Sequence, residues 1–342
     1  MLISSMPALH APVAWLSGFF LISLLLTMTA RSYAVRRRLI DKPGERRSHQ
    51  VATPRGGGIA IVIAMLLAIA VLAWLAPELR GRLGMLASGL VLVSGIGWWD
   101  DHRPLPPLLR LAVHAVSAGL LALVAHQSSG SLLITALSFV LTIVLVNIWN
   151  FMDGINGIAT TQALVVALAV AILGQQPAIT WLSLALVAAC AGFLPFNLVN
   201  ARIFLGDVGS GALGYLVAML IVLGGSSTTT ATQAGWWLLM LLPPAAFLVD
   251  ASLTLVLRIV RGQQWWKPHV QHAYQRWTAR LGSHWPVMVA YTAFALVGAL
   301  LAHVMHNKSL TLIIVGLVAW YLGGGILWLW IQSKQGKGLP GS

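Results

Sequence analysis

The chain has 342 residues, of which 58% are hydrophobic and only 8% are charged, and its mean hydropathy is +0.84. A soluble globular domain carries about 25% charged residues, so this composition excludes that class and places the chain in a membrane. The formal net charge is +13, and the presence of one cysteine, Cys190, excludes an internal disulfide.

Apolar segments long enough to cross a bilayer as helices follow one another almost from end to end. We expect eleven, at residues 11–30, 59–76, 82–98, 109–126, 131–147, 159–174, 178–195, 211–224, 235–258, 286–305 and 310–331. Such continuous runs are not the alternating strands of a transmembrane β-barrel, which excludes that fold. The sequence therefore predicts an all-α polytopic bundle that forms a single domain over residues 1–342.

Basic residues are distributed unequally between the two sides of this bundle. All Lys and Arg except Arg80, Arg82 and Lys308 fall in the loops of one side, which the positive-inside rule assigns to the cytoplasm. The N-terminus is then outside and the C-terminus cytoplasmic. No basic region precedes the first apolar segment, so we expect a retained helix rather than a signal peptide. Because the charge lies in short loops beside the bilayer, nucleic-acid binding is not expected.

Acidic residues are scarce, and their positions have no topological explanation, since acids contribute little to orientation. Only eight exist, and four stand at predicted cytoplasmic helix ends: Asp100, Asp101, Asp153 and Asp207. Carboxylate oxygens suit Mg²⁺ that is bound together with substrate phosphates. Each motif alone is compatible with an ordinary helix cap, but the gathering of so few acids on one side favours a shared site.

The segments around these acids also carry amides and glycines. "GIGWWDDHRPLPP" places two carboxylates just past the third helix, and "NIWNFMDGING" places Asn147 and Asn150 on one face of the fifth. "FNLVNARIFLGDVGSG" leads into the eighth helix, with Ser210 available as a cap. Glycines in all three segments allow the backbone to approach a ligand closely.

Two further cytoplasmic segments carry candidate anion-binding groups. "RIVRGQQWWKPHVQHAYQRWTAR" holds His269 and His272, which could bind a metal or a diphosphate or form a polar surface. "PRGGGIAI" resembles a phosphate cradle weakly, because no strand precedes it and no Walker Lys follows. It nevertheless offers backbone N–H groups at a helix N-terminus, with Arg55 beside them.

One acidic residue lies inside a predicted span. Asp250 follows Pro243 and Pro244 in the ninth apolar segment. An ionisable group at that depth is costly, so it either has a function or faces a polar partner such as Ser252 or Thr254.

The motifs together resemble a known family. "DKPGERRSHQVATPRGGG" (41–58), "DD" (100–101), "NxxNFMDGxNG" (147–157), "FNxxNARIFLGDVGSGALG" (196–214) and "HVQHAYQR" (269–276) are similar, in this order, to motifs of the polyprenyl-phosphate N-acetylhexosamine-1-phosphate transferases, glycosyltransferase family 4. That family includes phospho-N-acetylmuramoyl-pentapeptide transferase. The "HAYQ" form and the absence of a triple His favour its O-antigen-initiating branch.

The resemblance implies ten or eleven helices, a multi-pass protein of the bacterial cytoplasmic (inner) membrane and often a homodimer. It implies a Mg²⁺ cofactor, with Mn²⁺ as an alternative, in cytoplasmic active-site loops at about 31–58, 99–109, 148–158, 196–210 and 259–285. The implied reaction transfers an N-acetylhexosamine-1-phosphate from a UDP-N-acetylhexosamine to undecaprenyl phosphate and releases UMP. The sugar would be GlcNAc, GalNAc or a 6-deoxy relative such as FucNAc or QuiNAc, in O-antigen or other envelope polysaccharide synthesis.

Site residues carried over from the resemblance fall into two sets. Asp207 is the expected Mg²⁺ ligand, with Asp100 and Asp101 as catalytic carboxylates near the metal and the lipid phosphate. The expected substrate-binding residues are Asn147, Asn150, Asp153, Asn156, Asn197, His269, His272, Arg276, Arg55, Lys42 and His49. The chain departs from the family at Asn156, where many relatives have an acid, and at Val270, where several have Arg between the histidines.

Two other functions fit part of the pattern. A cation-coupled membrane transporter or flippase would place ionisable residues near the bilayer midplane and break helices in pairs, and only Asp250 and the Pro243–Pro244 pair fit. A non-catalytic scaffold gives no reason for four acids beside glycine turns.

Overall fold

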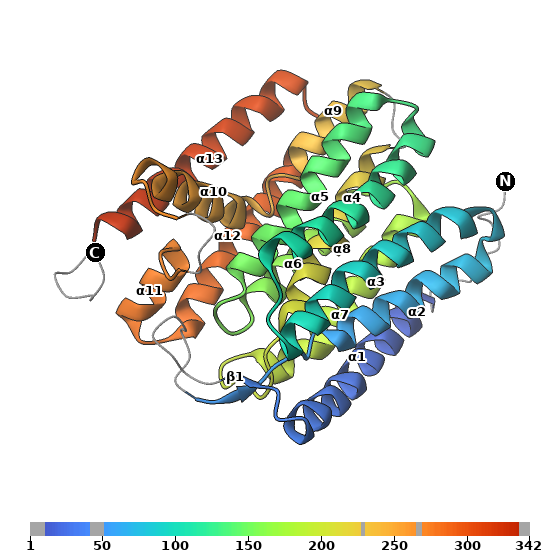
Figure 1. Ribbon diagram of the computed structural model, residues 1–342. Helices are drawn as coiled ribbons and strands as arrows, with labels where there is room; N and C mark the ends of the chain where they lie inside the picture. Colours follow the sequence, from blue (N-terminus) through green and yellow to red (C-terminus); the bar gives the residue numbers. More distant parts are fainter. Residues whose placement is uncertain (1–10, 42–50, 227–229, 265–268, 335–342) are drawn as a thin grey trace.

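The computed structural model describes residues 11–41, 51–226, 230–264 and 269–334, and over these residues the chain is a bundle of α-helices (Figure 1). The helices are α1 (Ala11–Arg36), α2 (Ile59–Leu75), α3 (Arg80–His102), α4 (Pro107–Ser129), α5 (Leu132–Met152), α6 (Ile158–Leu173), α7 (Pro177–Asn197), α8 (Asp207–Ser226), α9 (Thr230–Leu239), α10 (Ala245–Val260), α11 (Ala273–Leu281), α12 (His284–Met305) and α13 (Leu310–Ser333). A 3-10 turn, Pro77–Leu79, precedes α3, and two short strands, β1 (Ile40–Asp41) and β2 (Thr53–Pro54), pair antiparallel.

Eight helices of the described part are long and apolar enough to cross a membrane: α1, α3, α4, α5, α7, α8, α12 and α13. Helices α2 and α6 are apolar but shorter. The all-α polytopic fold is thus confirmed, while the count of eleven spans stays a prediction. The prediction of one helix over 235–258 is wrong, because α9 ends at Leu239 and α10 begins at Ala245. Pro243 and Pro244 lie in this break, where their rings and missing N–H groups interrupt helical hydrogen bonding.

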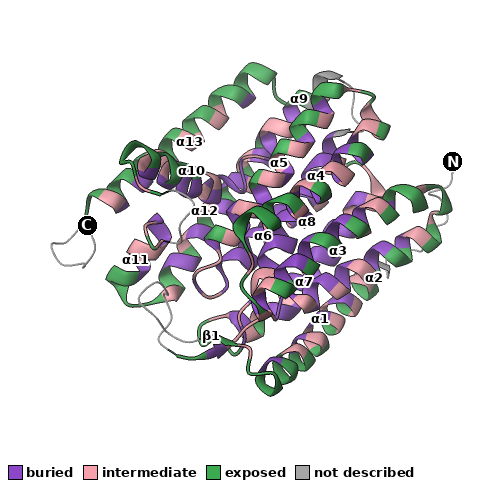
Figure 2. Cartoon of the chain, viewed as in Figure 1, coloured by how far each residue is buried: buried purple, intermediate pink, exposed green. Residues whose placement is uncertain are grey.

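Helix α8 lies at the centre of the bundle, and all its residues from 208 to 222 are buried (Figure 2). Helices α3 and α5 pack directly against it. The approach of α3 depends on Gly97, because a Cβ there would collide with the backbone carbonyl of Asp207. The small-residue pattern of "SGIGWW" and "GDVGSGALG" therefore draws the two acid-bearing helix ends together.

The motif-bearing helix ends meet at one end of the bundle, which we call the motif end. There α3, α5 and α7 finish, and α4, α6, α8 and α12 begin. The sequence predicted Asp100 and Asp101 just past the third helix. They lie instead within the last turn of α3, because α3 continues to His102 before Pro104. Asp153 is the C-cap of α5, and Asp207 is the first residue of α8.

Candidate active site

A polar cavity of about 310 Å³ opens at the motif end. It is lined by Asp41, Arg55, Asp101, Asn150, Phe151, Asp153, Gly154, Ile155, Asn156, Asn197, Phe204, Leu205, Gly206, Asp207, Ser210, Tyr274, Gln275 and His284. These residues come from five separate segments of the chain, so the cavity exists only in the folded bundle. Besides Asp101 and Asp207, five of the predicted site residues are among them: Arg55, Asn150, Asp153, Asn156 and Asn197.

Asp101 is buried and caps the N-terminus of α8. Its Oδ1 accepts a hydrogen bond from the backbone N–H of Asp207, and its Oδ2 accepts one from Val208, both at 3.1 Å. Only 2% of the residue is exposed. Gly206 permits this contact, because its φ is +75° and a Cβ would lie 2.6 Å from Asp101 Oδ2. Both oxygens of Asp101 thus satisfy helix N-terminal donors, and the residue fixes where Asp207 stands.

Asp100 and Asp207 converge on one cationic nitrogen. Arg110 Nη1 donates to Asp100 Oδ2 at 2.7 Å and to Asp207 Oδ2 at 3.3 Å. Asp100 Oδ1 also accepts from the backbone N–H of Leu105 at 2.6 Å, which fixes the turn between α3 and α4. The adjacent acids of the "DD" pair therefore have different partners, since neighbouring residues of a helix point about 100° apart.

Asp207 retains access to the cavity. Its side chain is 35% exposed, and its Oδ1 accepts a hydrogen bond from Asn150 Nδ2 at 3.1 Å. The same amide donates to Ser210 Oγ at 3.0 Å, so Ser210 bonds across the helices and does not cap α8. Asn147, expected beside Asn150, instead donates to Ile143 O within its own helix.

The residues around Asp207 fit a magnesium ion of the type that is held partly by substrate. Over the described residues, no group of three or more His, Cys, Asp or Glu side chains could enclose a metal. Two carboxylates, Asp100 and Asp207, nevertheless face a single cation, Arg110. Mg²⁺ typically takes one or two protein carboxylates and completes its octahedron with water and substrate phosphate oxygens. This donor set satisfies that requirement.

Asp153 contributes a further acid to the cavity. Burial, together with the negative charges of Asp207 and Asp101, raises the pKa of Asp153 well above its usual value. Like charges around one cavity cannot all remain ionised without a cation. The acids around this cavity therefore favour the binding of a cation.

Asn156 and Asn197 hold the turn that follows Asp153. Asn156 Nδ2 donates to Val199 O at 2.9 Å, and its backbone N–H donates to His284 Nδ1 at 3.3 Å. Asn197 accepts from the backbone N–H of Gly157 and donates to Ile203 O. An aspartate at 156 would set an oxygen against the Val199 carbonyl, which explains why this chain has an amide there.

Arg55 and the glycine loop before α2 pack onto the loop before α8. Arg55 donates to the backbone carbonyl of Asp101, and its Nε lies 3.7 Å from Asp101 Oδ1. The N–H groups of Gly57 and Gly58 donate to Phe204 O and Leu205 O. The weak prediction of a phosphate cradle there is wrong for these two donors, which are already used within the protein.

The histidine motif is organised by Asp250, a residue whose role the sequence left open. Asp250 accepts hydrogen bonds from the backbone of Ala273 (2.7 Å) and Tyr274 (3.0 Å), so it caps α11 from another helix. It also accepts from Thr254, Tyr291 and Trp328, on α10, α12 and α13. The polar partner proposed on its own helix, Thr254, is confirmed.

His272 is 4% exposed, and its Nδ1 lies 3.7 Å from Asp250 Oδ1. The ring of His269 lies beside it, tilted by 35°, with the ring centroids 4.8 Å apart. Burial, with the charges of His272 and Arg258, lowers the pKa of His269 to about 4. Neither imidazole lines the polar cavity as described, and Arg276 does not either. Tyr274 and Gln275, which lie between His272 and Arg276 in the sequence, line this cavity.

Some functional residues escape sequence reasoning. Arg110 was counted only as a topological charge, yet a cation in the first turn of a helix opposes the helix dipole and so signals a nearby acid. His284 opens α12 and reaches the cavity without any sequence signal. Lys42 and His49, expected to bind substrate, lie outside the described residues.

Known proteins of one family are similar to this chain. Residues 83–225, from α3 to α8, match the model of glycosyl transferase family 4. The decaprenyl-phosphate N-acetylglucosaminephosphotransferase of Mycobacterium tuberculosis is 31% identical over 234 residues, 58% of this chain and 56% of that protein. A probable undecaprenyl-phosphate N-acetylglucosaminyl 1-phosphate transferase of Bacillus subtilis is 25% identical over 294 residues, 80% of each chain. The phospho-N-acetylmuramoyl-pentapeptide-transferase of Moorella thermoacetica is 33% identical over 210 residues, 52% of this chain and 64% of that protein.

The matched part of this chain spans little more than half the length of the mycobacterial relatives. The family match nevertheless contains Asp101, Asn150, Asp153 and Asp207, which line the polar cavity, and Asp100, which does not line it. Residues 83–225 therefore resemble glycosyl transferase family 4, and the relatives that match the chain are polyprenyl-phosphate N-acetylhexosamine-1-phosphate transferases.

Proposed function

We propose that this protein transfers an N-acetylhexosamine-1-phosphate from a UDP-sugar to undecaprenyl phosphate and thereby initiates O-antigen or another envelope polysaccharide. The observation that carries the proposal is the convergence of Asp100 and Asp207 on one cation, Arg110, together with the polar cavity that Asp207 lines. Relatives whose names specify a polyprenyl phosphate and N-acetylglucosamine support the acceptor and the sugar class.

The location of the cavity suits a reaction between a lipid and a soluble nucleotide. It lies where apolar helices end, so a lipid phosphate in the bilayer interface and a nucleotide from the aqueous side can meet there. We place this side in the cytoplasm of the inner membrane, because the motif end carries nearly all the basic residues. A homodimer is part of the same proposal.

In the proposed reaction, an oxygen of the lipid phosphate attacks the sugar-bearing phosphorus of the UDP-sugar. The new phosphorus–oxygen bond forms as the bond to the bridging oxygen breaks, and UMP leaves with the electron pair. The second pKa of a phosphate monoester is about 6, so the attacking group is mostly dianionic at pH 7 and needs no strong general base.

The residues of the chain position two anions and disperse their charge. Asp207 and Asp100 would hold Mg²⁺, which when bound supplies Lewis-acid stabilisation of the phosphate charge. Asn150 fixes the carboxylate of Asp207, Asp101 fixes the helix that bears it, and Arg110 supplies a positive charge beside both. Asp153 and Asn156 line the part of the cavity that we assign to the nucleotide sugar.

The transporter alternative loses its main support. Asp250, its expected midplane acid, is occupied by hydrogen bonds from α10, α11, α12 and α13. Such a residue has no oxygen left for a transported ion, and the break between α9 and α10 has no counterpart in a second helix pair within the described residues.

The test is UMP release by the purified protein, supplied with undecaprenyl phosphate and a panel of UDP-N-acetylhexosamines. We expect release that requires the lipid and Mg²⁺, with Mn²⁺ tested as a substitute, and that identifies the sugar. Asp207→Asn should lower the rate by about 10²- to 10³-fold, the effect of removing one electrostatic group from a site of this type. A well-folded protein that releases no UMP from any donor would refute the proposal.

A further inference from the structure

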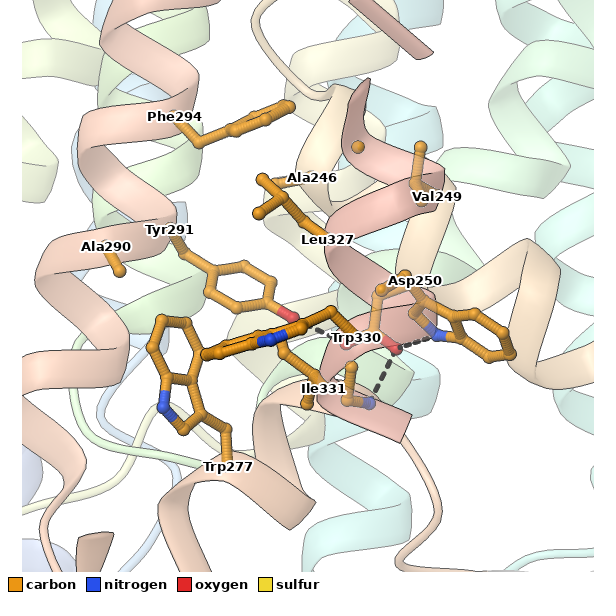
Figure 3. A pocket seen from close by; sticks show the side chains of 13 residues that line it. Ala246, Val249, Asp250, Trp277, Ala290, Tyr291, Phe294, Leu327, Trp330 and Ile331 are labelled. Atoms are coloured by element: carbon orange, nitrogen blue, oxygen red, sulfur yellow. Dashed lines mark hydrogen bonds between the residues drawn. The ribbon is translucent and has the colours of Figure 1, made fainter. Parts of the chain in front are cut away.

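A second cavity lies away from the polar one, among α10, α11, α12 and α13. Its volume is about 130 Å³, and its lining is almost wholly apolar. Figure 3 shows Phe294 at one end, Trp277 at the other, and Tyr291 and Trp330 between them. The polar residue in its wall, Asp250, has its carboxylate already engaged by Tyr291 and Trp328.

This cavity reaches the face of the bundle that contacts the bilayer. Leu327 and Trp330 line it, yet they are 50% and 49% exposed. They belong to α13, an apolar candidate span whose buried residues are only Ile313, Gly324, Trp328 and Ile331. An apolar cavity stays dry, and one that opens to lipid will admit a hydrocarbon chain.

Basic side chains lie near the part of the apolar cavity formed by Trp277 and Trp330. Trp277 is followed one turn later on α11 by Arg280, and Trp330 is covered by Lys334, whose Nζ lies 4.1 Å from the ring centroid. Partial burial, then the positive charges of Arg261 and Arg280, lower the pKa of Arg276. Arg276 is therefore close enough to Arg261 and Arg280 to be repelled by them.

Within the described residues, no salt bridge pairs these cations with a carboxylate. After Asp250 the sequence contains no Asp or Glu, whereas eight Lys and Arg residues follow. The one nearby acid, Asp250, is buried and bound by five donors. An anion from outside the protein is the group that this arrangement lacks.

We propose that the cavity lined by Trp277, Phe294 and Trp330 binds one anionic phospholipid, with an acyl chain in the cavity and its headgroup phosphate on Arg276, Arg280 and Lys334. An apolar slot that ends in unpaired cations matches the two ends of such a lipid. Helix α11 presents Ala273 and Trp277 to this cavity and Tyr274 and Gln275 to the polar one. The lipid would thus brace the helix that forms one wall of the candidate active site.

Native mass spectrometry of the protein released from nanodiscs tests this directly, since it measures binding without any activity. The protein is reconstituted with equal amounts of dioleoyl phosphatidylglycerol and dioleoyl phosphatidylcholine, and the retained lipid is counted. We expect one phosphatidylglycerol per chain in preference to phosphatidylcholine. Equal retention of the two lipids would overturn the proposal.

A matched pair of glycines provides the control for the cavity. A Cβ at Gly324 meets Phe294 and Val249 at 3.4 Å, whereas a Cβ at Gly323 meets nothing within 4 Å. Gly324→Leu should therefore fill the cavity and abolish retention, and Gly323→Leu should not. Equal retention in both variants would refute the site.

Charge variants leave the packing untouched and keep the test valid if Gly324→Leu fails to fold. Each basic residue near a membrane surface is worth about 1 kcal/mol, so Arg280→Gln and Lys334→Gln should each lower the preference for phosphatidylglycerol about fivefold. Arg31→Gln and Arg36→Gln, exposed on α1, should not change it. If undecaprenyl phosphate displaces the bound phospholipid at equal concentration, the occupant is the acceptor lipid and the assignment to phospholipid is wrong.

Discussion

The carboxylate of Asp101 accepts a hydrogen bond from the backbone N–H of Asp207, so one acid of the site holds another in place. Asp101 is buried, and each hydrogen bond to a buried charge is worth about 1.5–3 kcal/mol. Asp101→Asn retains only one acceptor oxygen and should lower the free energy of unfolding by about that amount. Thermal unfolding in detergent, measured beside UMP release, checks this.

Asp207→Asn is the matched control, because both Asp207 and its ion-pair partner Arg110 are partly exposed. Such pairs contribute about 0–1 kcal/mol, so stability should change little while activity is lost. If Asp101→Asn unfolds like the wild type but is inactive, Asp101 contacts substrate or metal and does not act through α8.

Arg110 occupies the point that a divalent cation would share with Asp100 and Asp207, so the two cations should compete. Unit charges 4 Å apart interact by about 4 kcal/mol at an effective dielectric of 20. Arg110→Gln should therefore lower the Mg²⁺ concentration for half-maximal activity about tenfold, equivalent to about 1.4 kcal/mol, while also lowering kcat.

The measurement is the Mg²⁺ dependence of UMP release, with Arg110→Lys as the charge-preserving control. Arg110→Lys should stay within a few-fold of the wild-type Mg²⁺ requirement. A higher Mg²⁺ requirement in Arg110→Gln would show that the guanidinium assists the metal, contrary to this expectation.

The helices could be predicted from sequence because apolar length determines them, and every predicted span contains a helix. Their ends were less certain, as the extension of α3 through Asp101 illustrates, since charged residues at a helix end leave no hydropathy signal. The break at Pro243 and Pro244 was visible in the sequence, but whether two prolines bend or end a helix depends on its neighbours.

The gathering of Asp100, Asp153 and Asp207 could be predicted, because their sidedness had no other explanation. The separate roles of Asp100 and Asp101 could not, since these depend on the rotation of α3 against α8, which Gly97 permits. The role of Asp250 also required the structure, because four of its five donors come from three other helices, α11, α12 and α13, that lie 23 to 78 residues away in sequence.

Asn156 stands where the family resemblance leads us to expect an acid, and its Nδ2 donates to Val199 O. Asn156→Asp would place an anionic oxygen against that carbonyl, so we expect a loss of about 0.5–1.5 kcal/mol in the free energy of unfolding and no gain in kcat. Thermal unfolding and UMP release check both. A faster enzyme of unchanged stability would mean that a second acid is useful here and that the Val199 contact is dispensable.

Asp250 caps α11, whose Tyr274 and Gln275 line the polar cavity. Asp250→Asn would turn an N–H₂ group toward its donors, leaving at least one unsatisfied at a cost of about 1–3 kcal/mol. We expect a rise in KM for the UDP-sugar greater than the fall in kcat, because α11 is displaced but Asp207 is not. Tyr291→Phe removes only one of the donors and should show a smaller shift of the same kind. Equal effects on KM and kcat would argue against a positioning role.

Asp153 makes the pH dependence of stability a probe of the acid cluster. Its pKa is raised in the folded protein by burial and by Asp207 and Asp101, so the folded state holds a proton that the unfolded chain has released above about pH 4. Stability is then greatest below that pH and falls as pH rises toward the raised pKa. We expect the melting temperature in chelator to decline between pH 5 and 8, and Asp153→Asn, which cannot ionise, to show a shallower decline.

Added Mg²⁺ should offset the decline in the wild type, because a cation relieves the repulsion that raises the pKa of Asp153. A wild-type slope that neither Asp153→Asn nor Mg²⁺ changes would mean that Asp153 is not part of the cluster that titrates.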